Sequence, residues 1–376
     1  MPQLTILTPS LRLGGAERSL VRLVNLLAEH DWSIHLIVFS PDDNELIQEL
    51  RADVQAHVLG IRRSSNPILW ALVHGLLRRL KPDVVMGWST YANLVAVVTR
   101  WKGDQWRLVL NERNYVPEMF HKTRTGTCSR RLILNAIRTL YRRADIVTAN
   151  SKQGCRFLQR FIGGGTKYFH IPNMIELSSL AECGDEQPYG LPENTEGPKL
   201  LALGRLDRQK GFDIALEAMV RVRAVRPWSL VIVGEGPERI GLKNMAGDLG
   251  LRNAVHWLGA RANPFGYYRW ADIVIVPSRF EGFPNVVLEA MACGRAVICS
   301  DCQTGPSELT DEGRYGVLVP PEDPDSLADA ILALGDDPTR RSSLGDAAAR
   351  YVADMYDVSV VEPMILEVLG VASPIT

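Results

Sequence analysis

The amino-acid sequence predicts an α/β protein with two doubly wound domains, each built on a parallel sheet. Three observations support this fold class. Short apolar runs alternate with helix-spaced segments, the alternation occurs twice, and a polar stretch separates the two sets. The 376 residues suffice for two ordinary domains, and the composition, 46% hydrophobic and 23% charged, is typical of a soluble globular protein.

The first half of the chain supplies the first sheet. Its apolar runs have the length of strands and are rich in branched residues, and the segments between them have helical spacing. We predict strands at Leu4–Thr8, Ile34–Phe39, Val84–Trp88, Leu108–Asn111 and Asp145–Asn150, and helices at residues 16–30, 68–80 and 130–143.

The second half repeats the pattern and supplies the second sheet. Strands are predicted at Lys199–Gly204, Ser229–Gly234, Val255–Gly259, Asp272–Pro277 and Ala296–Ser300, and helices at residues 211–225, 238–250, 285–293, 325–334 and 340–353.

The domain boundary is predicted at residues 176–198, which are polar, acidic and rich in Pro, Gly and Ser, with no apolar period. This linker joins an N-terminal domain, residues 1–175, to a C-terminal domain, residues 199–354. A final helix at about 355–376 is apolar enough to pack back on the first domain. Open α/β sheets bind ligands outside the carboxyl ends of their strands, so we expect the domains to face each other across a cleft.

Residues 281–294 carry the most informative pattern. Glu281 and Glu289 lie eight positions apart, on either side of a Gly-Phe-Pro turn and the start of a helix. Pro284 suits the first helical position, and the amides of Asn285 and Val286 at a helix start form an anion site. Phosphate on the amides and hydroxyls on the carboxylates together suggest a sugar nucleotide. The same two glutamates could instead be a favourable helix-dipole contact and a solvated surface residue, without any ligand.

Two cations and several glycines follow other predicted strands. Arg205 and Lys210 flank the loop after the strand that ends at Gly204, where they suit a diphosphate. Gly234 ends the next strand and permits close backbone approach of a ligand, although a simple tight turn would look the same.

In the first domain, Gly14 and Gly15 follow the first strand and precede a helix, so they can deliver backbone amides to a ligand. They form neither a dinucleotide-binding motif nor a phosphate-binding loop with its lysine. Glu112, in the stretch Asn111-Glu112-Arg113-Asn114, ends another strand, and either it or Arg113 is a candidate contact for the acceptor or the donor sugar.

The charge of the chain is divided between its halves. Residues 1–170 hold 24 Lys and Arg against 13 Asp and Glu, and residues 171–376 hold 18 against 30. A basic amphipathic helix within residues 122–143 predicts contact with an anionic membrane surface, although a core-packed helix with a solvated basic face fits the same pattern. The cations proposed for this contact are Arg130, Arg131, Arg138, Arg142 and Arg143.

Metal and redox chemistry find little support in the sequence. Cys299 and Cys302 form a lone Cys-x-x-Cys without a second pair, and reduced thiols in a cytoplasmic protein explain them more simply. Asp323 and Asp325 form a nominal Asp-x-Asp before a helix, and helix capping explains Asp325. No metal or cofactor is expected.

Taken together these motifs resemble the retaining GT-B glycosyltransferases of family 4, especially those that extend lipid-linked bacterial glycans. The resemblance runs from Gly14-Gly15 through the loop at 204–211 and the two glutamates to Gly305-Pro306 and the segment 316–320. It implies that Glu281 contacts the donor sugar, that Glu289 contacts the ribose, and that Arg205 and Lys210 hold the diphosphate. Asn111-Glu112 stands where some members carry a histidine, which is a departure from the family pattern.

The resemblance implies retaining transfer of a hexosyl or N-acetylhexosaminyl unit from a nucleotide sugar, with a UDP-sugar expected, to a saccharide acceptor in cell-surface glycan synthesis. The basic first domain favours a lipid-linked acceptor at the inner face of the cytoplasmic membrane and a peripheral, cytoplasmic protein. A UDP-sugar 2-epimerase on a similar scaffold is the alternative enzyme. A nucleotide-sugar-binding regulator or a nucleic-acid-binding protein is the alternative of another class, although no DNA-reading helix is recognisable and no nucleic-acid partner is expected.

Overall fold

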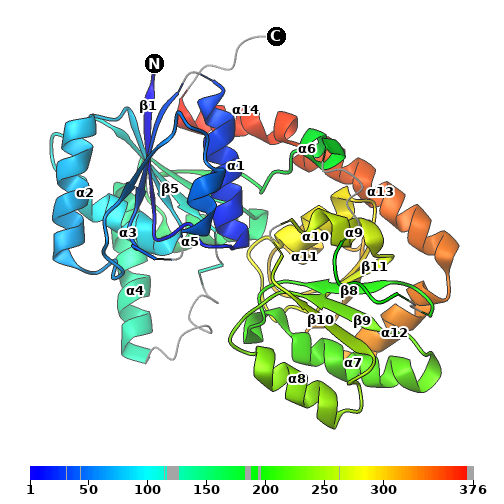
Figure 1. Cartoon of the computed structure of the whole chain (residues 1–376). Coiled ribbons are helices and arrows are strands. Elements are labelled where there is room, and N and C mark those ends of the chain that lie inside the picture. Colours follow the sequence, from blue (N-terminus) through cyan, green and yellow to red (C-terminus); the bar gives the residue numbers. More distant parts are fainter. Residues whose placement is uncertain are drawn as a thin grey trace. The chain divides into compact units, whose positions relative to one another are not determined.

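The structure is a computed structural model that describes residues 1–30, 32–42, 44–113, 115–116, 127–182, 188–193, 196–261 and 263–370. Contacts within the chain divide it into two compact units. Unit 1 comprises Met1–Asn173 and the segment from Glu362 onward, and unit 2 comprises Met174–Val361. Each unit is a parallel α/β sheet covered by helices (Figure 1).

Unit 1 contains a seven-stranded sheet in the order β3-β2-β1-β4-β5-β6-β7. Every neighbouring pair is parallel. Strand order reverses between β1 and β4, which is the position where sheets of this type bind ligands. The strands are β1 (Gln3–Thr8), β2 (Ser33–Val38), β3 (Gln55–Val58), β4 (Val84–Trp88), β5 (Arg107–Glu112), β6 (Ile146–Ala149) and β7 (Lys167–His170).

Helices cover both faces of this sheet, with α1 and α2 on opposite sides (Figure 1). Apolar residues of α2, α3, α4 and α5 share one core with the sheet, which explains the near-continuous apolar runs of its central strands. The helical elements of unit 1 are α1 (Gly15–Ala28), η1 (Glu45–Glu49), α2 (Pro67–Leu80), α3 (Thr90–Thr99), α4 (Thr127–Leu140), η3 (Tyr141–Arg143) and α5 (Lys152–Ile162), and α14 (Val358–Leu369) continues into it from unit 2.

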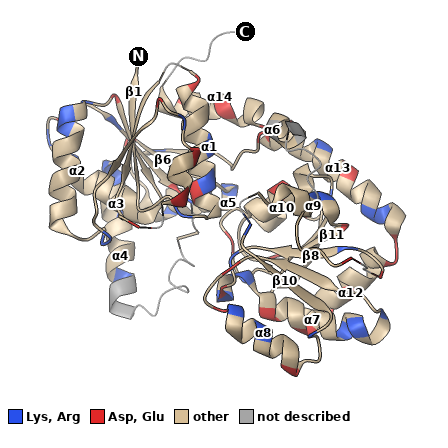
Figure 2. Cartoon of the chain, in the orientation of Figure 1, with Lys and Arg blue, Asp and Glu red and all other residues tan. Residues whose placement is uncertain are grey.

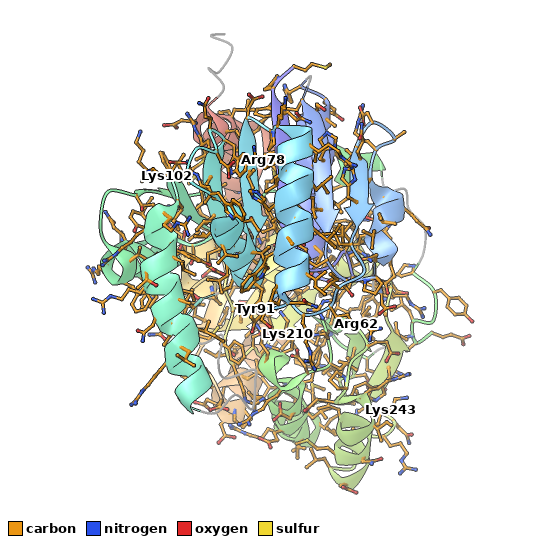
Figure 3. The ribbon with its side chains drawn as sticks, turned by 90° about the vertical axis from the view of Figure 1, so that its left-hand side faces the viewer. Arg62, Arg78, Tyr91, Lys102, Lys210 and Lys243 are labelled. Carbon is orange, nitrogen blue, oxygen red and sulfur yellow. The ribbon has the colours of Figure 1, made fainter. Side chains whose placement is uncertain are left out.

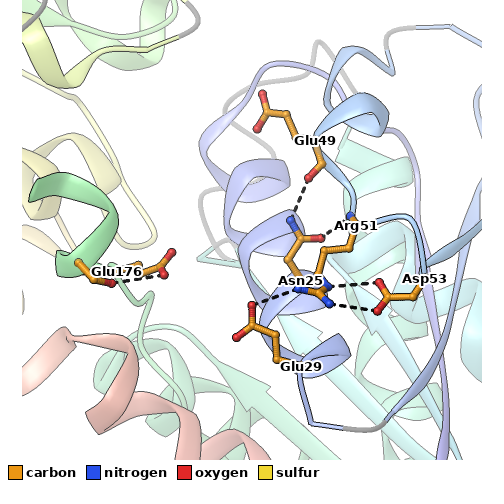
Figure 4. A network of polar contacts seen from close by, with 7 residues as sticks. Asn25, Glu29, Glu49, Arg51, Asp53 and Glu176 are labelled. Atoms are coloured by element: carbon orange, nitrogen blue, oxygen red, sulfur yellow. Dashed lines mark hydrogen bonds and ion pairs between the residues drawn. The ribbon is translucent and has the colours of Figure 1, made fainter. Parts of the chain in front are cut away.

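A surface network fixes the segment between η1 and β3 to α1 (Figure 4). The Asn25 amide donates to the carbonyl of Glu49 at 2.9 Å and accepts from the backbone of Arg51 at 3.0 Å. The Arg51 guanidinium then contacts both carboxylate oxygens of Asp53, at 3.2 and 3.3 Å, and Glu29 at 3.4 Å. The amide of Asn25 therefore replaces the backbone partners that a loop lacks.

Unit 2 contains a six-stranded sheet in the order β10-β9-β8-β11-β12-β13. Alternate residues of one strand enter different cores: Leu200 packs with α7, α8 and α12, whereas Leu201 packs with α9, α10 and α13. The strands are β8 (Leu200–Leu203), β9 (Leu230–Val233), β10 (Val255–Gly259), β11 (Ile273–Val276), β12 (Ala296–Ser300) and β13 (Val317–Val319). The helices are α6 (Leu177–Glu182), η4 (Arg208–Lys210), α7 (Phe212–Val225), α8 (Arg239–Asp248), α9 (Phe265–Trp270), α10 (Asn285–Ala292), α11 (Pro306–Leu309), α12 (Pro324–Gly335) and α13 (Pro338–Tyr356).

The fold class predicted from the sequence is confirmed, and each predicted strand is present to within a few residues. Helix α6 lies inside the stretch 176–198, where no apolar period is visible. Two local expectations were wrong. Pro284 is the N-cap of α10 rather than its first residue. The cap of α12 is Asp323, whose carboxylate accepts from the backbone of Ser326 at 2.9 Å, and Asp325 lies within the first turn.

Candidate functional site

Loops at the carboxyl edge of the unit 2 sheet pack backbone against backbone. Gly211, which follows η4, has φ +65°, and a Cβ there would collide with the carbonyl oxygen of Pro277 after β11. Gly234 has φ +154°, and a Cβ there would collide with the carbonyl oxygen of Gly204 after β8. Only glycine fits both the conformation and the space, so these glycines bring the loops after β8, β9 and β11 together.

Lys210 and Glu281 meet where two of these loops join. The Lys210 ammonium lies 2.7 Å from Oε1 of Glu281, with the side chains 21% and 6% exposed. Ser278 Oγ donates to the same carboxylate oxygen at 2.7 Å, and Thr304 Oγ1 donates to the Glu281 carbonyl at 2.5 Å. Residues following three strands therefore fix one buried carboxylate beside one cation.

Arg205 supplies a second cation on the same loop. Its guanidinium pairs with Asp207 and is about half exposed. Asp207 also caps η4 by accepting from the backbone of Lys210 at 3.3 Å. On this loop, Lys210 is held by the carboxylate of Glu281, whereas Arg205 is accessible to solvent. Two such cations are suited to bind a diphosphate.

Glu289 lies in α10 and is buried. The hydroxyl of Tyr268 in α9, itself fully buried, donates to Glu289 Oε2 at 3.1 Å. Asn285 and Val286, at the start of the same helix, are half-buried, and their N-cap offers no side-chain hydrogen bond. The sequence pattern identified the two glutamates but missed Ser278, Thr304 and Tyr268, which hold them.

In unit 1, Gly14 is the N-cap of α1, and the carboxylate of Glu17 lies directly against it. Arg12 pairs with this carboxylate at 3.4 Å. The chain itself therefore places a carboxylate, paired with Arg12, at the start of α1. The ligand contacts predicted for Gly14 and Gly15 stay a prediction.

Glu112 is buried inside a polar network of unit 1. Its carboxylate accepts from Thr90 Oγ1 at 2.7 Å, from the Tyr141 hydroxyl at 3.0 Å and from the Asn93 amide at 3.5 Å. Burial, together with the Glu112 charge, raises the pKa of Tyr141 well above its usual value. The network joins β5 to α3 and η3 and places the carboxylate 1% exposed, so a direct contact between Glu112 and substrate remains a prediction.

Arg113 extends this polar region. Its guanidinium lies 4.4 Å over the ring of Trp88 and donates to the amide oxygen of Asn173. Burial lowers the pKa of Arg113 to about 9, which the Glu112 charge only partly offsets. Trp88 in turn donates to the carbonyl of Ala16 at 3.0 Å, so these residues tie the edge of the sheet to the first turn of α1.

Arginines occur in the described part of α4 and in its continuation η3, and Figure 2 colours Lys and Arg positions blue on the ribbon. Arg131, Arg138, Arg142 and Arg143 are exposed, whereas the side chain of Arg130 lies outside the described part.

The apolar side of α4 mostly faces the core. Ile137 and Tyr141 are fully buried and Leu132 is 69% exposed. Exposed Arg78 of α2 and Lys102 after α3 add positive charge on unit 1 (Figure 3). The membrane interpretation therefore depends on charge rather than on an apolar face.

Within the described ranges, no group of His, Cys, Asp and Glu side chains could hold a metal ion. Cys299 and Cys302 are buried free thiols, and burial raises the pKa of Cys299 to about 12, which keeps it protonated and unreactive. No helix in the part of the chain that is described has both the length and the apolar character to cross a membrane.

Two family models match the chain. The model described as glycosyl transferases group 1 matches residues 197–337, and the model described as glycosyltransferase family 4 matches residues 13–179. A Campylobacter jejuni protein, N-acetylgalactosamine-N,N'-diacetylbacillosaminyl-diphospho-undecaprenol 4-alpha-N-acetylgalactosaminyltransferase, is 28% identical over 98% of this chain and 100% of its own length. The lipopolysaccharide core biosynthesis glycosyltransferase LpsE of Rhizobium meliloti is 26% identical over 95% of this chain and 96% of its own.

Solved structures share the fold. Sucrose-phosphate synthase from Thermosynechococcus elongatus superposes with a TM-score of 0.82 at 22% identity, covering 98% of both chains. Anabaena HepE, solved with UDP and glucose, gives 0.80 at 21% identity, covering 98% of this chain and 99% of that one. The two parallel-sheet units therefore form a GT-B fold.

Proposed function

Because the chain belongs to the group 1, family 4 glycosyltransferases, we propose that it transfers a hexosyl or N-acetylhexosaminyl unit from a UDP-sugar to a lipid-linked saccharide. The Lys210–Glu281 pair at the carboxyl edge of the unit 2 sheet carries this proposal, because it sets a cation for phosphate beside a carboxylate for sugar hydroxyls. HepE, with the same fold, was solved with UDP-glucose, which supports a UDP-linked donor.

Each donor contact has a chemical reason. Lys210 and Arg205 neutralise the charge that develops on the leaving diphosphate. Glu281 accepts hydrogen bonds from sugar hydroxyls, and Glu289, oriented by Tyr268, accepts them from the ribose. The glycine turns at Gly204 and Gly234 and the amides of Asn285 and Val286 allow the nucleotide to approach the backbone closely.

Transfer proceeds with retention at the anomeric carbon. The bond from that carbon to the phosphate oxygen breaks, and the acceptor oxygen forms its bond on the same face. The acceptor proton passes to a leaving phosphate oxygen. The protein then contributes positioning and charge stabilisation, and no side chain needs to remove the proton.

The acceptor is a saccharide carried on a lipid, and the protein works at the cytoplasmic face of an anionic membrane. The Campylobacter relative is named for a diphospho-undecaprenol acceptor, and LpsE for lipopolysaccharide core biosynthesis, which supports this class of acceptor. The exposed arginines of α4 and η3 suit anionic headgroups, each cation contributing about 1 kcal/mol.

A nucleotide-sugar screen tests the donor. Thermal shift with a panel of nucleotide sugars identifies the ligand, and transfer to a lipid-linked acceptor is then measured for Lys210→Ala and Glu289→Ala. Both variants should lose at least about 100-fold in turnover. Lys243→Ala, which changes an exposed lysine of α8, is the control and should match the wild type (Figure 3). Near wild-type transfer by both site variants would reject the assignment, and isomerisation of the sugar nucleotide without acceptor would indicate an epimerase.

Flotation with liposomes tests the location. Binding should require anionic lipid and weaken as salt rises. An R131A/R138A/R142A/R143A variant should bind less tightly. Binding that is indifferent to lipid charge and to salt would contradict the membrane proposal without affecting the donor assignment.

A further inference from the structure

Arg279 connects the two loops that carry Lys210 and Glu281. Its backbone amide donates to the carbonyl of Gln209 at 2.8 Å, and its guanidinium donates to the carbonyl of Arg208 at 3.0 Å. The Gln209 side chain returns the contact by donating to the carbonyl of Phe280 at 2.8 Å. Three hydrogen bonds therefore join the segment directly before Lys210 to the segment directly before Glu281.

The same guanidinium is held from two further sides. It contacts both carboxylate oxygens of Asp213, in the first turn of α7, at 2.8 and 2.7 Å. It also contacts Glu322, in the turn between β13 and α12, at 2.6 Å. The Arg279 side chain is only 17% exposed. A bidentate Arg–carboxylate contact fixes the orientation of the two groups as well as their distance, so the guanidinium holds the segments around it in a fixed arrangement.

We propose that Arg279 is a positioning residue for glycosyl transfer, because it fixes the loop bearing Lys210 against the loop bearing Glu281. This inference rests on the proposed function for what the two loops do. Lys210 must approach the diphosphate while Glu281 holds the sugar, and the charge on the diphosphate is larger in the transition state than in the bound donor. A displacement of about 1 Å between catalytic groups costs on the order of 100-fold in rate. Loss of the Arg279 contacts should therefore lower kcat more than it weakens donor binding.

A control pair exists at the other end of α7, the helix that carries Asp213. Arg226, the C-cap of α7, makes a bidentate contact with Asp336, at 3.1 Å for both hydrogen bonds. This pair has the same chemistry as Arg279–Asp213 and lies in unit 2, but it contacts neither loop. Arg279→Lys and Arg226→Lys each keep the positive charge and remove the planar fork.

Steady-state transfer and hydrogen–deuterium exchange provide the test, with UDP-glucose as the first donor probe. Arg279→Lys should lower kcat by about 10- to 100-fold while donor KM changes less than about threefold. Arg226→Lys should leave both constants at the wild-type value. Exchange should become faster in residues 204–211 and 277–284 for Arg279→Lys alone.

Two results would overturn the proposal. Equal loss of kcat in both variants would mean that any weakened pair in unit 2 has this effect. Unchanged exchange in both loops of Arg279→Lys would mean that the guanidinium does not hold them. If the wild-type protein transferred no sugar from any donor, the proposed function would fail, and the exchange comparison would still decide whether Arg279 fixes the loops.

Discussion

The ion pair between Lys210 and Glu281 contributes to stability and to proposed catalysis, and a double-mutant cycle separates the two. In Lys210→Met the carboxylate of Glu281 keeps Ser278 as a partner but loses its cation. Removing one partner of a buried pair costs about 3–5 kcal/mol. Because the Lys210 side chain is 21% exposed, water can partly replace it, and we expect the lower end, about 3 kcal/mol.

Removing the carboxylate instead of the cation should lower the free energy of unfolding by less. Glu281→Gln leaves the Lys210 ammonium unpaired but hydrated, which should cost about 1–2 kcal/mol. The double variant leaves no unpaired charge, so its loss of stability should be smaller than the sum of the single losses, with a coupling of about 2 kcal/mol. Activity should not recover. Without Lys210 the developing charge on the diphosphate has lost a donor, which costs about 100- to 1,000-fold in kcat.

Urea unfolding followed by circular dichroism measures the stability of the four proteins, and transfer at saturating donor measures their activity. The chain has two units and more than one transition is expected, so the cycle is evaluated on the transition that shifts in Lys210→Met. Additive losses would show that the two side chains are not coupled in solution. Recovery of transfer in the double variant would refute the assigned role of Lys210.

Three further changes test other parts of the two units. Tyr268→Phe removes the hydroxyl that orients Glu289, so UDP should bind about tenfold more weakly by calorimetry, while Tyr267→Phe should bind normally; equal affinities would contradict the ribose assignment. Gly234→Ala places a methyl group against a carbonyl oxygen of the β8 loop, at a φ that suits only glycine, and should lower the free energy of unfolding by about 3 kcal/mol; wild-type stability would show that the loops move apart easily. Burial lowers the pKa of His170 to about 4, so the unfolded chain binds more protons below pH 6.5 and stability falls as the pH drops. The loss should reach about 2 kcal/mol at pH 5 and be absent in His170→Gln, whereas a pH profile shared by both proteins would assign it to other groups.

Apart from the edge strand β10, whose residues are mostly half-buried, the strands that the sequence predicted are buried on both faces, where a parallel sheet requires continuous apolar runs. The two edge strands of unit 1 were missed for the complementary reason. Strand β3 is exposed at three of its four positions, and β7 has one exposed and three half-buried residues, so neither contains an apolar run. Backbone pairing with β2 and β6 fixes their places in the sheet, and this pairing does not require a particular pattern of side-chain polarity.

The unit 2 site was predictable in part for a similar geometric reason. Lys210 and Glu281 each follow a strand of one parallel sheet, and the carboxyl ends of such strands share an edge, so their meeting follows from the strand assignment. The partners Tyr268 and Thr304 were not predictable. Hydroxyl groups carry no periodic pattern, and whether one meets a carboxylate depends on the packing of α9 against α10 and on the course of the loop after β12.

Glu112 shows how strand alternation limits a role inferred from position alone. Its place at the end of β5 suggested a side chain facing a ligand, but residues two and four positions earlier, Leu110 and Leu108, belong to the core shared with α2–α5. Side chains alternate along a strand, so Glu112 points into the same helical layer, where Thr90 and Tyr141 hold it. The same alternation turns Asn111 to the other face. A carboxylate so placed fixes the start of α3 at the carboxyl edge of the sheet.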